Sequence, residues 1–449
     1  MTSALLTDMV VIFGVAIAVL FVSTRLGLPA IVGLLLTGVL AGPHGLMLVK
    51  AVHEVEVSAE IGVILLLFTI GIEFSLKQLM QIRRSVLLGG GLQALFTVGA
   101  TVAMVRLVGI GTGEAVFIGF LVTLSSTAIV LKVLQEAGEV DSPHGHASLA
   151  TLIFQDIMVV PMVLITPFLA GNVENSAAGL ALTLVKAVGT IALVLMGAKW
   201  LVPQMLYQVA RTRSRELFLL TLFVICLVVV WLTSSMGLSF ALGAFLAGLV
   251  VSESEYSHQA LGNLIPFRDV FTSFFFVSIG MLLDVRFLLE HLVVVLVLVL
   301  IVLVVKGLIA GLVTAILGYP LRTAILVGLA LNQLGEFSFI LSKNGLAEGF
   351  LAGDTYQLFL AVAVLTMAAA PLIIHGAPRI ADALLRLPIP DALKTRCTVC
   401  AVNSHHGERK DHLVIIGFGV NGRNLSRVAK IAGIKHVIID TNPDTVMTE

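Results

Sequence analysis

The stretch LLEHLVVVLVLVLIVLVVKGLIAGLVTAIL, residues 288–317, decides the class of fold. After Glu290 it contains one charged side chain, Lys306, and its apolar residues do not alternate with polar ones. A helix needs about 20 apolar residues to cross the hydrocarbon core of a membrane, whereas the strands of a membrane barrel alternate. The pattern therefore predicts a membrane-spanning α-helix here.

Twelve further stretches show the same pattern between charged or Gly/Pro-rich breaks. They lie at roughly 4–24, 28–46, 57–77, 85–108, 113–134, 145–170, 178–206, 214–234, 236–251, 264–283, 322–343 and 355–385. The first has neither a basic n-region nor a small-residue cleavage site, so we expect a retained helix rather than a signal peptide. We predict an all-α polytopic membrane protein with about 13 transmembrane helices.

Composition agrees with this class. Hydrophobic residues make up 58% of the 449 residues and charged residues 12%, against about 25% in soluble proteins. So few charges could not cover a soluble surface, and they exclude a nucleic-acid-binding protein or a disordered chain. Three cysteines give no disulfide framework.

Basic residues in the short loops predict the orientation. With the N-terminus outside, ten Lys or Arg residues fall in cytoplasmic loops and four in external loops. The ten are Arg25, Lys77, Arg83, Arg84, Lys132, Arg211, Arg213, Arg215, Arg268 and Arg322, and the four are Lys50, Arg106, Arg286 and Lys343. An odd number of helices then places the C-terminal tail in the cytoplasm.

Similar segments recur at an offset of 209 or 210 residues. The matching segments are 28–38 with 238–248, 67–71 with 275–280, and Gly119-Phe-Leu with Gly328-Leu-Ala. Seven predicted crossings separate the members of each pair, so the two copies are expected to be inverted in the membrane. Inverted repeats are typical of secondary transporters.

Three charged residues lie near the middle of predicted spans: Asp156, Lys306 and Glu336. Such groups cost at least about 2.5–3.5 kcal/mol and usually mark a transport pathway. Asp156 follows the amide Gln155, and together their oxygens can replace part of the water shell of a monovalent cation. Because the same carboxylate can also take up a proton, this pair could exchange the two ions.

Lys306 is the natural counter-charge for Asp156 in the empty site, although a fixed ion pair elsewhere in the bundle would also account for it. Two predicted spans contain short polar runs at equivalent positions of the two repeats, which predict interrupted helices. The first run contains Ser125, Ser126 and Thr127, and the second contains Asn332, Gln333, Gly335 and Glu336. Unwound carbonyls and half-helix ends could then face the ion.

The tail contains a dinucleotide-binding pattern. Residues 411–416 are predicted to form a strand that enters the turn Gly417-x-Gly419-x-x-Gly422. A helix and a second strand ending at Asp440 would follow, with Asp440 placed for a ribose hydroxyl. We therefore divide the chain into a transmembrane exchanger domain (1–386), a linker (387–410) and the first part of a Rossmann-like regulatory domain (411–449).

We expect that domain to be truncated, because the nine residues after Asp440 leave about a quarter of a complete nucleotide-binding domain. No intact cofactor site is expected in this chain. The sequence contains no phosphate-binding Gly-x-x-x-x-Gly-Lys-Ser/Thr loop, no Gly-Tyr-Gly filter of a potassium channel and no His-Glu-x-x-His motif. Beyond the transported cation, no metal site is expected.

The chain resembles the Kef-type potassium/proton antiporters of the monovalent cation:proton antiporter-2 family over nearly its whole length. The motifs that carry the resemblance are Leu67-Phe-Thr-Ile-Gly-Ile-Glu73, Ser125-Ser-Thr-Ala128, Phe154-Gln-Asp156, Ser252-Glu-Ser-Glu-Tyr-Ser-His258, Phe275-Phe-Val-Ser-Ile-Gly-Met281 and Gly335-Glu-Phe337. The resemblance implies a homodimer with the inverted-repeat sodium/proton antiporter fold in the bacterial inner membrane. It also adds Glu73 to the candidate site.

In that family the Gln-Asp pair holds the cation and the proton, and the nucleotide domain regulates transport with NADH or AMP. Some members also respond to glutathione adducts and have an ancillary cytoplasmic regulator. The loop Gln259-Ala-Leu-Gly-Asn263 is less acidic than the regulatory loop of glutathione-gated members.

The prediction is a secondary transporter rather than an enzyme, exchanging K⁺ for H⁺ with Asp156 as the shared carrier. Two alternatives remain open from the sequence. One is an Na⁺/H⁺ antiporter of the same fold, because selectivity depends on sub-ångström placement of oxygens. The other is a nucleotide-gated cation channel.

Overall fold

The computed structural model describes residues 2–49, 52–73, 86–140, 142–170, 189, 201–235, 240–351, 353–386 and 412–439. The predicted linker 387–410, Asp440 and most of the predicted span 178–206 lie outside these ranges.

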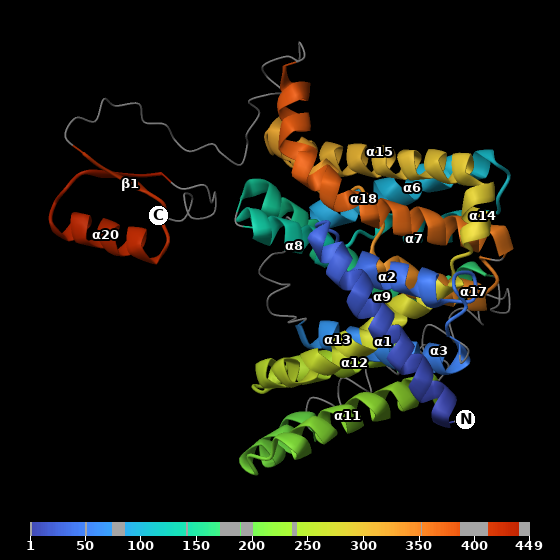
Figure 1. Cartoon of the computed structure of the whole chain (residues 1–449). Helices are drawn as coiled ribbons and strands as arrows, with labels where there is room; N and C mark the ends of the chain where they lie inside the picture. The colour runs from blue at the N-terminus through green and yellow to red at the C-terminus, as the bar shows by residue number, and fades with distance from the viewer. Residues whose placement is uncertain are drawn as a thin grey trace.

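The described part of residues 1–386 is built from helices, which Figure 1 shows as a bundle. In the first half they are α1 (Thr2–Arg25), α2 (Ala30–Ala41), α3 (Val52–Glu73), α6 (Gly91–Leu107) with the π-helical turn η1 (Val86–Gly90) before it, α7 (Thr112–Thr123), α8 (Thr127–Ala137) and α9 (Pro143–Leu169). In the second half they are α11 (Arg215–Ser235), α12 (Phe240–Ser252), α13 (Ser257–Leu282), α14 (Val285–Glu290), α15 (Leu292–Ile316), α16 (Leu321–Ala330), α17 (Glu336–Ala347) and α18 (Gly353–Leu385).

These helices coincide with twelve of the thirteen predicted spans. Within the described ranges, nine helices or helix pairs are long and apolar enough to cross a membrane, and α2, most of α12 and α16 are shorter apolar helices. The thirteenth span has a described helical part at residues 201–211. The total of 13 transmembrane helices therefore stays a prediction.

Glycine contacts between the two repeats are reciprocal. A Cβ atom added to Gly38 of α2 would lie 2.8 Å from the Cα atom of Gly280 in α13. A Cβ atom added to Gly71 of α3 would lie 2.8 Å from the Cα atom of Gly248 in α12. At these distances only glycine lets the two backbones approach so closely. Since Gly38 matches Gly248 and Gly71 matches Gly280 in sequence, each contact is the counterpart of the other, as an inverted repeat predicts.

The next helix pair follows the same rule. Gly119 of α7 packs against Val98 of α6, and Gly328 of α16 packs against Gly307 of α15. Gly328 and Gly307 lie 209 residues after Gly119 and Val98, respectively. A Cβ atom on Gly119 would lie 3.2 Å from the Cα atom of Val98, and one on Gly328 would lie 2.5 Å from the carbonyl oxygen of Gly307. The repeat therefore sets where helices pack as well as where they begin.

The described tail has the predicted order of elements. Strand β1 (Leu413–Ile416) pairs in parallel with β2 (His436–Ile439), with Leu413 opposite His436, and α20 (Val420–Ile431) connects them. Gly417 has φ +88°, a conformation that favours glycine, and a Cβ atom on Gly422 would lie 2.0 Å from the Gly417 carbonyl oxygen. The turn therefore needs both glycines, as a tight strand-to-helix connection does.

Candidate functional site

The two predicted helix interruptions are present, and they contact each other. Helix α7 ends at Thr123 and α8 begins at Thr127, while α16 ends at Ala330 and α17 begins at Glu336. The hydroxyl of Ser125 donates a hydrogen bond to the Leu331 carbonyl oxygen at 3.0 Å. A Cβ atom on Gly335 would lie 2.6 Å from the carbonyl carbon of Ser125. The two breaks thus cross at direct backbone contact, which only a glycine allows.

Lys306 of α15 ties the two breaks together. Its side chain is fully buried, and its ammonium nitrogen donates to the carbonyl oxygens of Leu124 and Gln333, both at 2.6 Å. Leu124 caps the C-terminal end of α7, and Gln333 follows the C-terminal end of α16. Because the C-terminal end of a helix carries partial negative charge, one ammonium stabilises both half-helix ends.

This geometry gives Lys306 contacts that differ from the expected pairing with Asp156. The sequence predicted an ion pair with Asp156, but for these two described residues the structure records no such pair. The hydrogen bonds it records for the ammonium go to backbone carbonyls instead. The physical reason is that the two helix interruptions leave carbonyl oxygens without a partner in their own helix. Because these oxygens are buried away from water, they need another donor.

Asp156 lies in the middle of α9 and is half-buried. Its two carboxylate oxygens accept hydrogen bonds from the Thr127 hydroxyl, at 3.2 and 3.0 Å. Thr127 is the first residue of α8, so the carboxylate faces a half-helix N-terminus, which carries partial positive charge. The structure therefore brings together two of the predicted site residues, the acid and the end of the first break.

Gln155 points into the protein from the same helix and is fully buried. Its Oε1 atom accepts from the backbone N–H of Ser125 at 2.7 Å, and its Nε2 atom donates to Oε1 of Gln93 at 2.9 Å. Nε2 of Gln93 in turn donates to the hydroxyl of Thr97 and, at 3.5 Å, to the carbonyl oxygen of Thr123. The Gln155 amide thus holds the first break in place through the Ser125 N–H.

Gln93 is a residue that our sequence reasoning missed. Gln93 carries no charge, so intramembrane charge as a criterion does not select it. The available signal was its position, since it is the one amide side chain in the predicted span 85–108. It also lines a cavity of about 10 Å³ with Thr151 and Thr314, which is room for about one water molecule.

The second break holds three more predicted residues, all buried: Asn332, Gln333 and Glu336. Within the described part of the chain, Asn332 Oδ1, both amide atoms of Gln333 and Glu336 Oε2 make no hydrogen bond. The Glu336 carboxyl lies beside the Ser126 hydroxyl and the N–H of Ala128. It therefore sits between the N-terminal ends of α8 and α17.

Three further predicted residues, Ser126, Glu73 and Gly419, lie at the ends of described helices. Ser126 caps α8, because its hydroxyl accepts from the N–H of Ile129 at 3.3 Å. Glu73 is the last residue of α3, a helix that packs against α12 and α13. In the tail, Gly419 caps α20, and Asp440 lies outside the described residues.

The arrangement places the half-buried Asp156 carboxylate next to the Thr127 hydroxyl, at the end of one of two crossed unwound segments. Oxygen ligands of this kind suit a hard monovalent cation, and a carboxylate can alternatively bind a proton. In the described ranges, no cluster of His, Cys, Asp or Glu residues could hold a resident metal ion. Groups of this kind can bind a cation or a proton reversibly.

Comparison with known proteins agrees with the fold and the motifs. The family model described as "Sodium/hydrogen exchanger, transmembrane" matches residues 10–377. Over 438 residues the chain is 33% identical to a putative K(+) efflux antiporter KefB from Alkalimonas amylolytica, covering 97% of this chain and 66% of that protein. It is 32% identical to the chloroplastic K(+) efflux antiporter 1 of Arabidopsis thaliana, over 93% of this chain and 35% of that protein.

A solved structure shows the same fold. The sodium proton antiporter MjNhaP1 from Methanocaldococcus jannaschii, at pH 8, superposes with a TM-score of 0.64 at 15% sequence identity, covering 86% of this chain and 99% of that one. The chain spans about a third to two thirds of the length of the two relatives above. With the Kef-type K⁺ efflux antiporters among its relatives, this chain belongs to the transmembrane sodium/hydrogen exchanger family.

Proposed function

We propose that this protein exchanges K⁺ for H⁺ by alternating access, with Asp156 as the shared carrier. The observation that supports this most directly is the Asp156 carboxylate, half-buried at mid-helix and hydrogen-bonded to Thr127 at the first break. A charged carboxylate in the interior of a membrane has a high free-energy cost, and such groups usually mark an ion pathway. The names of the relatives, K(+) efflux antiporters, favour K⁺ as the cation.

The proposed exchange depends on competition at one carboxylate. A proton or a cation occupies Asp156, and either one neutralises the charge, so the loaded site can change its access from one side to the other. The empty, charged site is held back by the cost of moving a bare carboxylate through the membrane. One carrier that cannot move empty gives obligatory exchange.

The neighbouring residues have supporting roles in this proposal. Thr127 offers a hydroxyl oxygen next to the carboxylate, and Gln155 fixes the position of the first break through the Ser125 N–H. Gln155 Oε1 retains a second lone pair that a cation could use. Lys306 keeps the two half-helix ends together, so that the crossing moves as one unit.

Proteoliposomes containing a pH-sensitive dye test the carrier. Asp156→Asn keeps the size of the side chain but removes its charge, and we expect K⁺-dependent proton movement to disappear. Asp269→Asn is a matched control, because Asp269 is an exposed acid that pairs with Arg268 at 2.9 Å. Exchange by Asp156→Asn at the wild-type rate would show that another group carries the ions.

The same assay distinguishes K⁺ from Na⁺ and Li⁺ as the transported cation, and it distinguishes an exchanger from a channel. We expect K⁺ to drive exchange at lower concentration than Na⁺ or Li⁺, and the opposite order would favour the Na⁺/H⁺ alternative. Competition also predicts that the pH of half-maximal exchange falls as the K⁺ concentration rises, because more cation displaces the proton. Single-channel currents without proton movement would contradict exchange and favour the nucleotide-gated channel.

We further propose a regulatory role for residues 411–449, as the first part of a cytoplasmic nucleotide-binding domain. Support comes from the parallel pair β1 and β2 and from the tight turn at Gly417 and Gly422. NAD(H) or AMP would bind when the domain is complete, with Gly419 and Asp440 at the phosphates and ribose. To test this, the chain is fused to a complete nucleotide-binding domain, and exchange is measured while NADH is titrated. An exchange rate that does not change with NADH would contradict regulation by this domain.

The assembly and placement that the resemblance implies are also proposals: a homodimer in the bacterial inner membrane, with the N-terminus outside and the tail inside. Labelling of single cysteines from each side of intact cells tests the orientation. The mass of the purified protein in detergent tests the dimer.

A further inference from the structure

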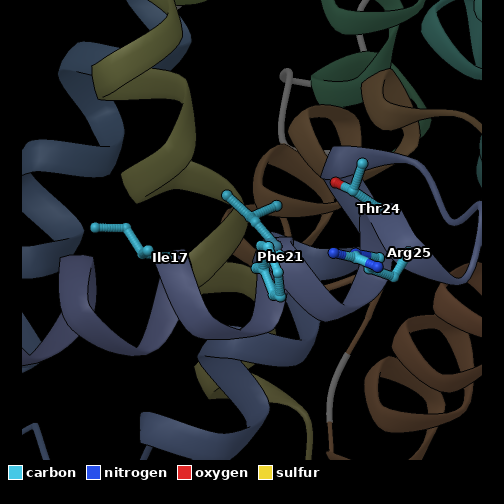
Figure 2. A pocket seen from close by; sticks show the side chains of 5 residues that line it. Ile17, Phe21, Thr24 and Arg25 are labelled. Atoms are coloured by element: carbon cyan, nitrogen blue, oxygen red, sulfur yellow. The ribbon is translucent and has the colours of Figure 1, made fainter.

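Tyr356, in the first turn of α18, is a buried polar residue that the proposed exchange does not use. Its side chain is 7% exposed, and its hydroxyl makes no hydrogen bond in the described part of the chain. An exposed hydroxyl can bond water, as at Thr24 on the open face of α1 that Figure 2 shows. A buried hydroxyl normally has a partner, so an unbonded one points to a water molecule or an ion beside it.

Aromatic contacts fix the position of this hydroxyl. The Tyr356 ring stacks on Phe359 with 6.4 Å between the ring centres, and Phe359 contacts Phe339 of α17 edge to face at 5.9 Å. Ser342 follows Phe339 by three residues, and its hydroxyl donates to the Phe339 carbonyl oxygen at 2.8 Å. Because this bond uses the only proton of the Ser342 hydroxyl, the lone pairs of its oxygen remain available to a cation or a donor.

A carboxylate from another group of helices completes the set. The Tyr356 hydroxyl lies near the Ser342 hydroxyl and within electrostatic reach of the Glu56 carboxylate on α3, and it is hydrogen-bonded to neither. Helix α3 packs against α12 and α13, whereas α17 packs against α7 and α9. Gln357 donates to the Leu282 carbonyl oxygen at 2.9 Å, which ties the start of α18 to the end of α13. The three oxygen-bearing side chains therefore meet at the boundary between the two groups.

These side chains lie to one side of the crossed breaks. Ser342 follows Glu336 by six residues, which is about 9 Å along α17. Glu56 and Tyr356 are in the first two turns of their helices, α3 and α18. Lys343, which follows Ser342 directly, is among the basic residues predicted to be external. The three side chains thus lie between the crossing and the helix ends that this orientation places outside.

We propose that Glu56, Ser342 and Tyr356 form a second cation site, which binds K⁺ on its way between the outer surface and Asp156. The proposal rests on the proposed K⁺ exchange. The carboxylate supplies the charge, and the two hydroxyl oxygens replace part of the water shell of a hard monovalent cation. A water molecule alone would also satisfy the Tyr356 hydroxyl, but it would not depend on the charge of Glu56.

The test measures K⁺ binding rather than exchange. The full chain carries Asp156→Asn, and its melting temperature in detergent is followed as K⁺ replaces choline at constant ionic strength. We expect a saturable rise, because a ligand of the folded state stabilises it. In this background Glu56→Gln should abolish the rise, and Tyr356→Phe should raise the K⁺ concentration for half of the effect about fivefold. Both substitutions keep the approximate size of the side chain, and Tyr356→Phe breaks no recorded hydrogen bond.

Two control variants in the same background match these substitutions. Glu60→Gln removes the same charge from an exposed position one turn further along α3. Tyr207→Phe removes a hydroxyl from a side chain that is 50% exposed. We expect both to keep the K⁺ response of the background.

Three outcomes would overturn the proposal. A chain with Asp156→Asn that shows no K⁺ response would leave the crossing as the place where K⁺ binds. Equal losses in Glu56→Gln and Glu60→Gln would indicate general attraction to an acidic surface. An unchanged response in Glu56→Gln or in Tyr356→Phe would assign the Tyr356 hydroxyl to a water molecule. The carrier proposal fails separately, through exchange by Asp156→Asn at the wild-type rate.

Discussion

The two interrupted helices occupy equivalent places in the two repeats, yet they differ in how their polar groups are satisfied. In the first break, the Leu124 carbonyl accepts from Lys306, the Ser125 N–H donates to Gln155, and the Ser125 hydroxyl donates to the second break. In the second break, Asn332, Gln333 and Glu336 each keep at least one buried side-chain atom without a hydrogen bond in the described part of the chain.

This difference suggests different roles for the two breaks. A break whose groups are bonded in this way is held in one geometry, and it can present Thr127 to Asp156 at a fixed place. A break with unused donors and acceptors has groups ready to bond water, a cation or a rearranged backbone, and it gains stability when it does so. We therefore regard the first break as the support of the proposed ion site and the second as the part that would respond to its occupancy.

Lys306→Leu should have the largest effect, because it removes the link between the two breaks. Two buried carbonyl oxygens, those of Leu124 and Gln333, would lose a charged donor, at a cost on the order of 3–5 kcal/mol. Thermal unfolding in detergent measures it. Lys132→Leu is the control, since Lys132 is exposed and pairs with Glu136 at 3.9 Å, a contact worth about 0.5 kcal/mol. Equal melting temperatures would show that Lys306 does not hold the crossing.

Gly335→Ala tests the direct backbone contact between the breaks. The new Cβ atom would lie 2.6 Å from the carbonyl carbon of Ser125, and backbone on both sides must shift, at a cost of about 1–3 kcal/mol. Gly262→Ala, in the second turn of α13 with open space around it, should be neutral or stabilise by up to about 1 kcal/mol. If both variants melt alike, the breaks can separate freely.

Gln93→Leu tests the support behind the first break. Gln155 Nε2 would lose its acceptor and the Thr123 carbonyl a donor, at a cost of about 1–3 kcal/mol. Since the Gln155 amide would no longer be fixed, we also expect a higher K⁺ concentration for half-maximal exchange.

A matched control separates positioning from stability. Gln357 makes an equivalent pair of bonds outside the crossing, to the Asp284 N–H and the Leu282 carbonyl, both at 2.9 Å. Gln357→Leu should lower the melting temperature similarly and leave half-saturation unchanged. In Gln93→Glu, a carboxylate oxygen can still accept from Gln155, so half-saturation should recover in part. Identical half-saturation in all three variants would argue against a positioning role.

Gln333→Met should have the smallest effect on stability, because no hydrogen bond of this side chain is recorded in the described part of the chain. Replacing an unsatisfied buried amide by an apolar group of similar size is expected to be neutral or to stabilise by about 1 kcal/mol. The comparison is Gln155→Met, which breaks bonds at the first break and should destabilise. A larger loss of stability in Gln333→Met would reverse the roles that we assign to the two breaks.

Much of this architecture was predictable from local pattern. The spans follow from apolar length, the interruptions from Ser, Thr, Asn and Gly inside apolar stretches, and the repeat from the offset of 209 residues. The partners of each polar group were not predictable in the same way. Lys306 was expected at Asp156 because opposite charges attract, and the sequence does not tell which carbonyls an interrupted helix will leave unsatisfied.

The sequence by itself determined that this chain is a membrane protein of two related halves with ionisable groups at mid-membrane, because hydropathy and spacing are properties of each segment alone. Only the tertiary structure decided that Lys306 bonds Leu124 and Gln333, that Gln93 supports Gln155, and that the second break keeps unsatisfied groups. The physical reason is that a hydrogen bond in a membrane interior needs a partner within about 3 Å, and such partners come from helices far apart in the chain.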